Sequence, residues 1–180
     1  MNFLELARRR QSARRYEPGR RIPREALDRC LEAARLAPSA CNSQPWSFVV
    51  VDDPDEVRAL AEASCCRAPY GMNRFAADAS AIVVVVTEKM KLAARLGAQF
   101  RGVQYSLVDV GIAGEHLVLQ AAEEGLGSCW LGWFDERAVK RRLGLARGQK
   151  VDLLICLGHA ADGEVREKVR RPLEDVRRYT

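Results

Sequence analysis

The sequence predicts a single α+β domain over residues 1–180. Helical periodicity alternates with short aliphatic segments that are typical of buried strands. No internal repeat and no linker divides the chain. With 48% hydrophobic and 29% charged residues the composition is that of a globular protein, and 180 residues are enough to bury one sizeable core.

Three amphipathic helices are expected in the first part of the chain. Residues 2–10 form a short one. The clearest one begins at residues 22–24, with a proline in its first turn and small or aliphatic side chains along one stripe, and it ends before Pro38. Pro54 and two acids open a third helix over residues 54–64, because the helix dipole favours negative charge at that end.

Four apolar segments are expected to supply the sheet: residues 47–53, 81–87, 128–134 and 151–160. The second of them, AIVVVVT, has no polar alternation. Such a run is typical of a strand that is covered on both faces.

The remaining segments are helices or irregular structure. Residues 103–124 lack proline and contain many small residues, which predicts a long and deeply packed helix ended by glycines. A short amphipathic helix is expected over residues 135–144. Residues 88–102 are polar and fit either a helix or a mobile cover. Residues 163–180 are expected to form a charged, extended tail that could not fold alone.

The sequence lacks the motifs of several classes of protein. There is no GxxxxGK[ST] loop, no GxGxxG after the first strand and no GxSxG elbow. Two histidines and six cysteines without CxxC spacing argue against a zinc site, so no metal is expected. We expect no membrane span, and because the N-terminus lacks the apolar region of a secretory signal we expect a cytoplasmic protein.

Positive charge gathers near the two ends of the chain. Residues 1–24 carry eight arginines and two acids, and residues 164–180 carry six cations and four acids. This pattern fits a solvated basic surface, two ends that converge on one anion, or a nucleic-acid face. A nucleic-acid partner is the weakest of these, because only Tyr16 lies among the N-terminal arginines.

Alternation along an extended chain singles out two groups of polar side chains. It would place Arg10, Ser12 and Arg14 on one side, and it would do the same for Lys168 and Arg170. Together these groups could close around a phosphate with charge-assisted hydrogen bonds. The alternative for each cation alone is a solvated surface charge.

Four segments resemble, in the same order, the signature segments of the FMN-dependent nitroreductase family: RRRQSARRY, APSACNSQPW, GLGSCWLGWF and CLGHAADGEVREKVRRPL. The resemblance covers essentially the whole chain. It implies an α+β fold with a central, mostly antiparallel sheet flanked by helices, and an intertwined homodimer with two FMN molecules at its interface. The helix at 103–124 would form the core of that interface, and the tail at 163–180 would pack on the partner subunit.

The resemblance also implies which residues bind FMN. Those at the phosphate and pyrimidine are Arg10, Gln11, Ser12, Arg14, Lys168 and Arg170. Those that reach the flavin from the other subunit are Pro38, Ser39, Ala40 and Asn42, and those at the edge carrying N5 are Trp130, Leu131 and Gly132. Ala40 departs from the serine of many relatives, so one hydroxyl contact is lost. Asn73 is a further candidate for the pyrimidine, although a turn residue is the simpler interpretation.

The activity implied by the resemblance is electron transfer from NAD(P)H through flavin N5 to an electrophilic acceptor, such as a nitroaromatic or a quinone, by a ping-pong mechanism. The cofactor performs the chemistry, so no side chain is expected to be a catalytic acid or base. Two alternatives remain open. One is an FMN-binding sensor or carrier without turnover, and the other is a flavin-fragmenting or dehalogenating relative of the same fold.

Overall fold

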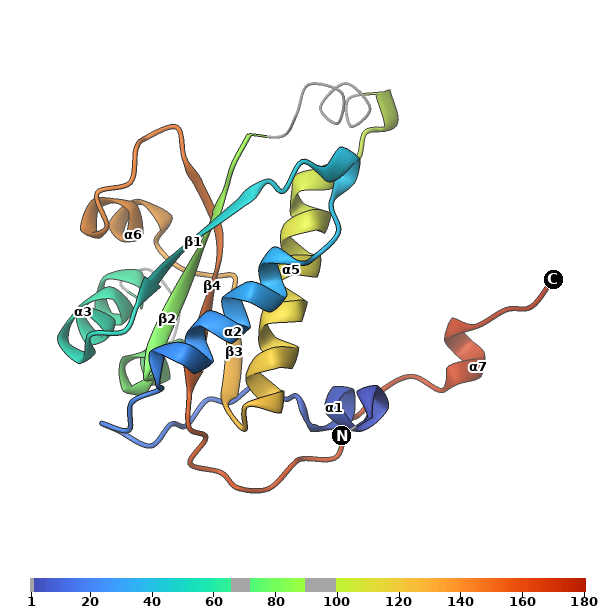
Figure 1. Cartoon of the computed structure of the whole chain (residues 1–180), viewed down its shortest axis with the longest axis horizontal. Helices are drawn as coiled ribbons and strands as arrows, with labels where there is room; N and C mark the ends of the chain where they lie inside the picture. The colour runs from blue at the N-terminus through green and yellow to red at the C-terminus, as the bar shows by residue number, and fades with distance from the viewer. Residues whose placement is uncertain (1, 66–71, 90–99) are drawn as a thin grey trace.

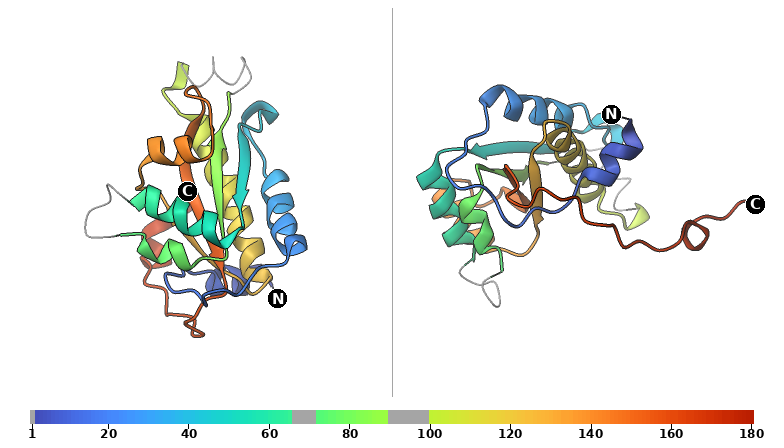
Figure 2. Two further views of the ribbon diagram at one scale, coloured as in Figure 1. Left: turned by 90° about the vertical axis from the view of Figure 1, so that its left-hand side faces the viewer. Right: turned by 90° about the horizontal axis from the view of Figure 1, so that it is seen from below.

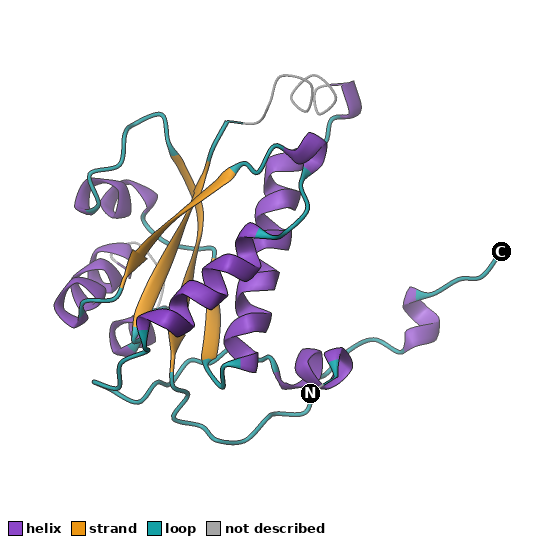
Figure 3. Cartoon of the chain, viewed as in Figure 1, coloured by secondary structure: helices purple, strands orange, loops and turns teal. Residues whose placement is uncertain are grey.

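The computed structural model describes residues 2–65, 72–89 and 100–180. Its centre is a four-stranded sheet built from β1 (Trp46–Val51), β2 (Ala81–Thr87), β3 (Gly127–Leu131) and β4 (Lys150–Gly158). The strands lie in the order β1-β2-β4-β3, and every neighbouring pair is antiparallel. Figure 3 shows this sheet in orange, with helices on both of its faces. The predicted central antiparallel sheet is confirmed.

Helices cover the sheet as two layers. On one face lie α2 (Arg24–Arg35) and α5 (Tyr105–Glu123), and on the other lie α3 (Pro54–Cys65), the 3-10 helix η3 (Arg74–Asp78) and α6 (Glu136–Arg142) (Figure 1).

Strand β2 explains why the sheet needs both layers. Its side chains alternate between the two cores: Val83 and Val85 pack on the α2 and α5 side, whereas Ile82, Val84 and Val86 pack on the α3 side. All five are at most 1% exposed. A strand buried on both faces has no room for a polar residue, which is why its sequence shows no alternation.

Small residues let α5 lie close to its neighbours. Ala113 and Ala121 are fully buried in the core shared with α2. A Cβ atom on Gly114 would lie 2.5 Å from Cη2 of Trp130, a residue of β3. These residues therefore pack within one chain, and the part of α5 left open carries Leu107 and Val108, which are 44% and 51% exposed.

The two ends of the chain lie beside each other before the tail departs. Helix α1 (Phe3–Arg9) is capped by Asn2 and Glu5, and it lies against α5. Figures 1 and 2 show the C-terminal segment passing α1 and then leaving the body of the molecule. The tail is extended as predicted, except for the single turn of α7 (Leu173–Val176), which the sequence analysis missed.

Other elements differ modestly from their predicted bounds. Strand β3 ends at Leu131 rather than at residue 134, because the chain turns there and the Asp135 carboxylate accepts the Ala138 N–H (3.0 Å) to begin α6. The short helix η3 was not predicted. Of the polar segment 88–102, residues 90–99 lie outside the described residues.

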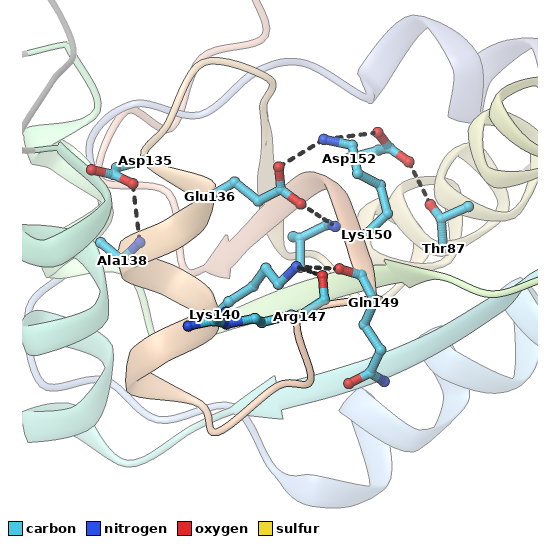
Figure 4. Close-up of polar contacts among 10 residues, drawn as sticks. Thr87, Asp135, Glu136, Ala138, Lys140, Arg147, Gln149, Lys150 and Asp152 are labelled. Carbon is cyan, nitrogen blue, oxygen red and sulfur yellow. Dashed lines mark hydrogen bonds and ion pairs between the residues drawn. The ribbon is translucent and has the colours of Figure 1, made fainter.

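Polar contacts fix the loop between α6 and β4 (Figure 4). The ammonium of Lys140 donates to the carbonyl oxygens of Arg147 (2.8 Å) and Gln149 (2.5 Å). Glu136 accepts from the Lys150 ammonium (2.7 Å), so α6 is also tied to the first residue of β4. The loop is therefore held by charge-assisted hydrogen bonds in addition to the packing of Leu143 and Leu145 on the core.

Replacing Lys140 by methionine should lower the free energy of unfolding by about 1–3 kcal/mol, because two carbonyl groups lose a charged donor while the alkyl packing is kept. Urea unfolding measures the loss. The neighbouring Arg141→Met removes the same charge from an exposed side chain and should change stability by less than about 0.5 kcal/mol. Equal losses from the two substitutions would contradict the assigned role of Lys140.

Candidate functional site

Residues 10–16 run along the open edge of β3. Ser12 forms a parallel bridge with Ser128, and the Ala13 N–H donates to the Ser128 carbonyl (2.8 Å). The contact is close because Gly127 has no side chain: a Cβ there would lie 2.7 Å from that of Ala13. Since Ala13 and Tyr16 are buried, the backbone is fixed in register, and so are the positions of the polar residues between them.

The C-terminal segment returns to these residues. The Arg166 N–H donates to the Gln11 side-chain oxygen (3.0 Å), and the Gln11 amide nitrogen donates to the Glu164 carbonyl (2.9 Å). Arg166 also donates to the Ser12 carbonyl (2.5 Å), and the Lys168 ammonium donates to the Arg10 carbonyl. The two charged ends of the chain thus meet, as one of the three interpretations of the charge pattern required.

The contacts between the two segments change the expected role of Gln11 and add Arg166 to the candidate site. The amide of Gln11 binds the C-terminal segment through both its oxygen and its nitrogen, which leaves one amide N–H and the backbone for a ligand. Arg166 was missed by the sequence analysis. Its signal was available, because Arg166, Lys168 and Arg170 follow the same alternation that singled out the last two.

Cations crowd together where the two segments meet. Burial lowers the pKa of Lys168 below its usual 10.5, and the nearby Arg10, Arg170 and Arg166 lower it further. The Arg10 side chain is three-quarters buried, and its Nε has no hydrogen-bond partner although it lies 3.5 Å from a Glu115 carboxylate oxygen. An anion would relieve both the repulsion and the unsatisfied donor.

The other predicted phosphate residues lie around this cluster. Ser12 and the exposed Arg14 lie beside the buried thiol of Cys129. Burial raises the pKa of this thiol, whereas Arg14 and Ser12 act to lower it. Arg170 is exposed, and its guanidinium donates to the Val169 carbonyl (2.8 Å). The structure therefore brings Arg10 and Lys168 into direct contact, with Arg170 at the margin.

The three residues expected at the N5 edge of the flavin, which lie at the end of β3 and directly after it, differ in how exposed they are. The Trp130 ring is half-buried against α5, and Leu131 is 3% exposed with its side chain in the hydrophobic core. Only the backbone of Leu131 could therefore meet a ligand. Gly132 is exposed with open space around its Cβ position. Asn73 lies close by, at a φ of +72°, and donates to the Trp133 carbonyl (2.7 Å), so it does occupy a turn.

Residues 38–44 meet α5 at a different turn from the cationic cluster. Figure 1 shows the 3-10 helix η1 (Ala40–Asn42) at the first turns of α5, whereas residues 10–14 lie near its last turns. Pro38, Ser39, Ala40 and Asn42 are therefore not brought to Arg10 within one chain. The loop is also strained: Cys41, Asn42 and Gln44 have φ values of +51°, +50° and +47°, each costing about 1–3 kcal/mol.

A cavity lies beside the N-terminal part of the cluster. The cavity lined by Arg10, Gln11 and Ser128 has a volume of about 240 Å³. Pockets for drug-sized ligands occupy roughly 300–1,000 Å³. A larger cavity of about 560 Å³ lies at α6 and the following loop, and it contains none of the predicted site residues.

Within residues 2–65, 72–89 and 100–180, no helix is both long and apolar enough to cross a bilayer. The same stretches hold no group of three or more His, Cys, Asp or Glu side chains that could bind a metal ion.

Comparison with known proteins assigns the chain to a family. A sequence profile described as the Nitroreductase family matches residues 7–159. An NADH dehydrogenase of Thermus thermophilus is 34% identical over 94% of this chain and 92% of that protein. A nitroreductase family protein of Clostridium difficile 630 is 26% identical, with a TM-score of 0.80 and 99% and 98% of the two chains covered.

A further solved structure with the same fold was determined with bound flavin. A protein of Exiguobacterium sibiricum, solved in complex with FMN, has the same fold with a TM-score of 0.78 at 22% identity, and the match covers 100% of this chain and 98% of that one. Because the family profile spans most of the sequence, the chain belongs to the nitroreductase family and is an oxidoreductase.

Proposed function

We propose that this protein is an FMN-dependent oxidoreductase that passes electrons from NAD(P)H to an electrophilic acceptor, such as a nitroaromatic or a quinone, in a ping-pong cycle. The observation that carries the proposal is the cationic cluster at the joined chain ends, where the buried Nε of Arg10 lies beside Glu115 but has no hydrogen-bond partner, and where nearby arginines and burial lower the pKa of Lys168. Family membership supports the same conclusion, since the Thermus thermophilus relative is named an NADH dehydrogenase.

The residues present fit FMN. Its phosphate would be held by Arg10, Ser12 and Lys168, with Arg166 and Arg170 adding positive charge. When bound, FMN supplies the two-electron chemistry that connects the nicotinamide to the acceptor.

The remaining residues would orient the flavin. Arg14 places positive charge where the pyrimidine end would lie, and the Gly132 N–H is a backbone donor at the edge of the site. No acid or base on this chain is required.

We propose that a second copy of the chain completes each site. Within one chain Ala40 contacts Asp109 of α5 whereas Arg10 lies beside Glu115, so the two segments meet the helix at different turns, and the cavity beside Arg10 has a volume of only about 240 Å³. Apolar side chains that a second copy could bury are exposed on three segments: Phe3 and Leu4 on α1, Leu107 and Val108 on α5, and Val169, Leu173, Val176 and Tyr179 on the tail. Light scattering should therefore report a dimer.

FMN binding should take up a proton at alkaline pH. Burial and neighbouring cations lower the pKa of Lys168 in the free protein, and a phosphate dianion would raise it again. Between those two values Lys168 is neutral when free and charged when FMN is bound, so binding consumes protons. Calorimetry over a series of pH values up to the usual lysine pKa of 10.5, in buffers of different ionisation enthalpy, measures the uptake. Lys168→Met should abolish it, and an unchanged uptake in that variant would contradict the assignment.

Anaerobic reduction tests the proposed activity. The purified protein, loaded with FMN, is mixed with NADH or NADPH, and the loss of flavin absorbance is followed before acceptors are added. Reduction by a nicotinamide and reoxidation by a nitroaromatic or quinone support the proposal. Bound FMN that neither nicotinamide reduces would favour a sensor or carrier, and selective reoxidation by a halogenated phenol would favour a dehalogenating enzyme.

A further inference from the structure

Asp109 is a buried carboxylate that the proposed chemistry does not use. It lies in the second turn of α5 and is 2% exposed. One of its oxygens, Oδ1, accepts the Ala40 N–H (3.1 Å), whereas Oδ2 is buried without a hydrogen-bond partner. No cation pairs with it among the described residues. A carboxylate in such surroundings is costly, and an apolar side chain would suit them better unless its acceptor is needed.

The Ala40 N–H belongs to the strained loop that would contact the flavin. Other hydrogen bonds of residues 39–44 are local ones: the Gln44 N–H donates to the Ser39 hydroxyl (2.9 Å), and the Gln44 amide donates to the Asn42 side-chain oxygen (2.9 Å). Within the described residues, the contact with Asp109 is the one hydrogen bond that ties this loop to α5. Local bonds shape the loop, and Asp109 fixes its place.

We propose that Asp109 is a positioning residue that holds residues 39–44 where Ser39 and Asn42 meet the FMN bound by a second copy of the chain. This inference rests on the proposed function. The positioning role accounts for a buried carboxylate on a helix whose other buried residues are mainly apolar. The Asp109 oxygen gives the Ala40 N–H a buried acceptor, so it can hold a loop whose left-handed residues favour other conformations.

Two substitutions separate the acceptor from the charge. Asp109→Asn keeps an oxygen for the Ala40 N–H, whereas Asp109→Leu removes it. With Asp109→Leu, the dissociation constant of FMN should rise about tenfold or more, and with Asp109→Asn it should stay within about threefold of the parent. Flavin fluorescence titration at a temperature far below unfolding measures both values. Urea unfolding of the same samples should show no loss of stability with leucine that matches the loss of affinity, because an incompletely satisfied buried charge has been removed.

A third substitution removes the same hydrogen bond from the other side. Ala40→Pro deletes the N–H, and proline is well tolerated at the first position of a helical turn that follows an extended residue, which Ser39 is at a φ of −148°. If Asp109 acts through this bond, Ala40→Pro should weaken FMN binding, and adding it to Asp109→Leu should cause little further loss. This variant also serves if Asp109→Leu fails to fold.

The outcomes separate a failure of the proposed function from a failure of the role proposed for Asp109. A parent protein that does not bind FMN would overturn the proposed function itself. A parent that binds FMN, with the Leu and Pro variants folded and binding it equally well, would overturn only the role of Asp109. Equal losses of affinity with Asn and Leu would also overturn it, because the acceptor oxygen would then not matter.

Discussion

Replacement of Gly114 by valine is expected to lower the free energy of unfolding by about 3 kcal/mol. The Cβ would lie 2.5 Å from Cη2 of Trp130 and 3.1 Å from two further ring atoms, and no pair of carbon atoms tolerates the shortest of these distances. The ring is half-buried against α5, so relief requires the indole to turn away and lose that packing, or the helix to shift. Overpacking of this kind costs typically 1–3 kcal/mol, and a β-branched residue adds two more methyl groups to the clash.

Gly111 provides the matched control on the same helix. A Cβ at Gly111 meets nothing within 4 Å, so Gly111→Ala should stabilise the chain by up to about 1 kcal/mol through helix propensity. Urea unfolding of both variants measures the contrast. A loss from Gly111→Ala equal to that from Gly114→Val would show that α5 resists any added side chain, and that the contact with Trp130 is not the cause.

The features of the fold that the sequence analysis recovered share a physical origin. Strand β2 was placed with both bounds correct because Ala81–Thr87 must be apolar on two faces, which leaves a continuous run. Helix α2 was placed because only one of its faces is buried, and Pro23 and Pro38 limit it. In both cases burial acts directly on the local residue pattern, so the pattern can be read without knowing the partners.

The missed features depend on contacts between distant parts of the chain. Helix η3 is short, and no periodicity marks it. The use of the Gln11 amide could not be foreseen, because its partners Glu164 and Arg166 lie more than 150 residues away in the sequence. Asp109 carried no motif either, since its importance arises only from the burial around it and from the Ala40 N–H. Hydrogen bonds made by single side chains leave little trace in a sequence.

The double substitution Arg10→Met and Lys168→Met should raise the dissociation constant of FMN by about 10²–10⁴-fold. Each side chain would lose a charge-assisted hydrogen bond to the phosphate, worth roughly 1.5–3 kcal/mol. Methionine preserves much of the alkyl packing, which matters because Arg10 is three-quarters buried. Flavin fluorescence titration gives the dissociation constant, and circular dichroism confirms that the variant is folded.

A control pair separates local contacts from net charge. Arg8 and Arg171 are exposed residues of the same two segments, so Arg8→Met with Arg171→Met removes the same total charge. This pair should weaken FMN binding by less than about tenfold, because exposed charges act weakly through water and salt. Equal losses of FMN affinity from the two pairs would mean that the basic ends attract FMN only through their overall positive charge. The assignment of Arg10 and Lys168 as direct phosphate ligands would then be wrong.

A last variant separates charge from tethering. Lys168 both carries charge and donates to the Arg10 carbonyl, so its loss could act by releasing the tail. Gln11→Ala removes the side-chain hydrogen bonds that Gln11 makes to Glu164 and Arg166, leaves the Arg166 bond to the Ser12 carbonyl, and keeps every cation. If charge at the phosphate dominates, Gln11→Ala should cost about tenfold or less in FMN affinity, well short of the double substitution. If the two losses match, the cations matter chiefly because they join the ends of the chain, and the phosphate must be bound mainly by other groups.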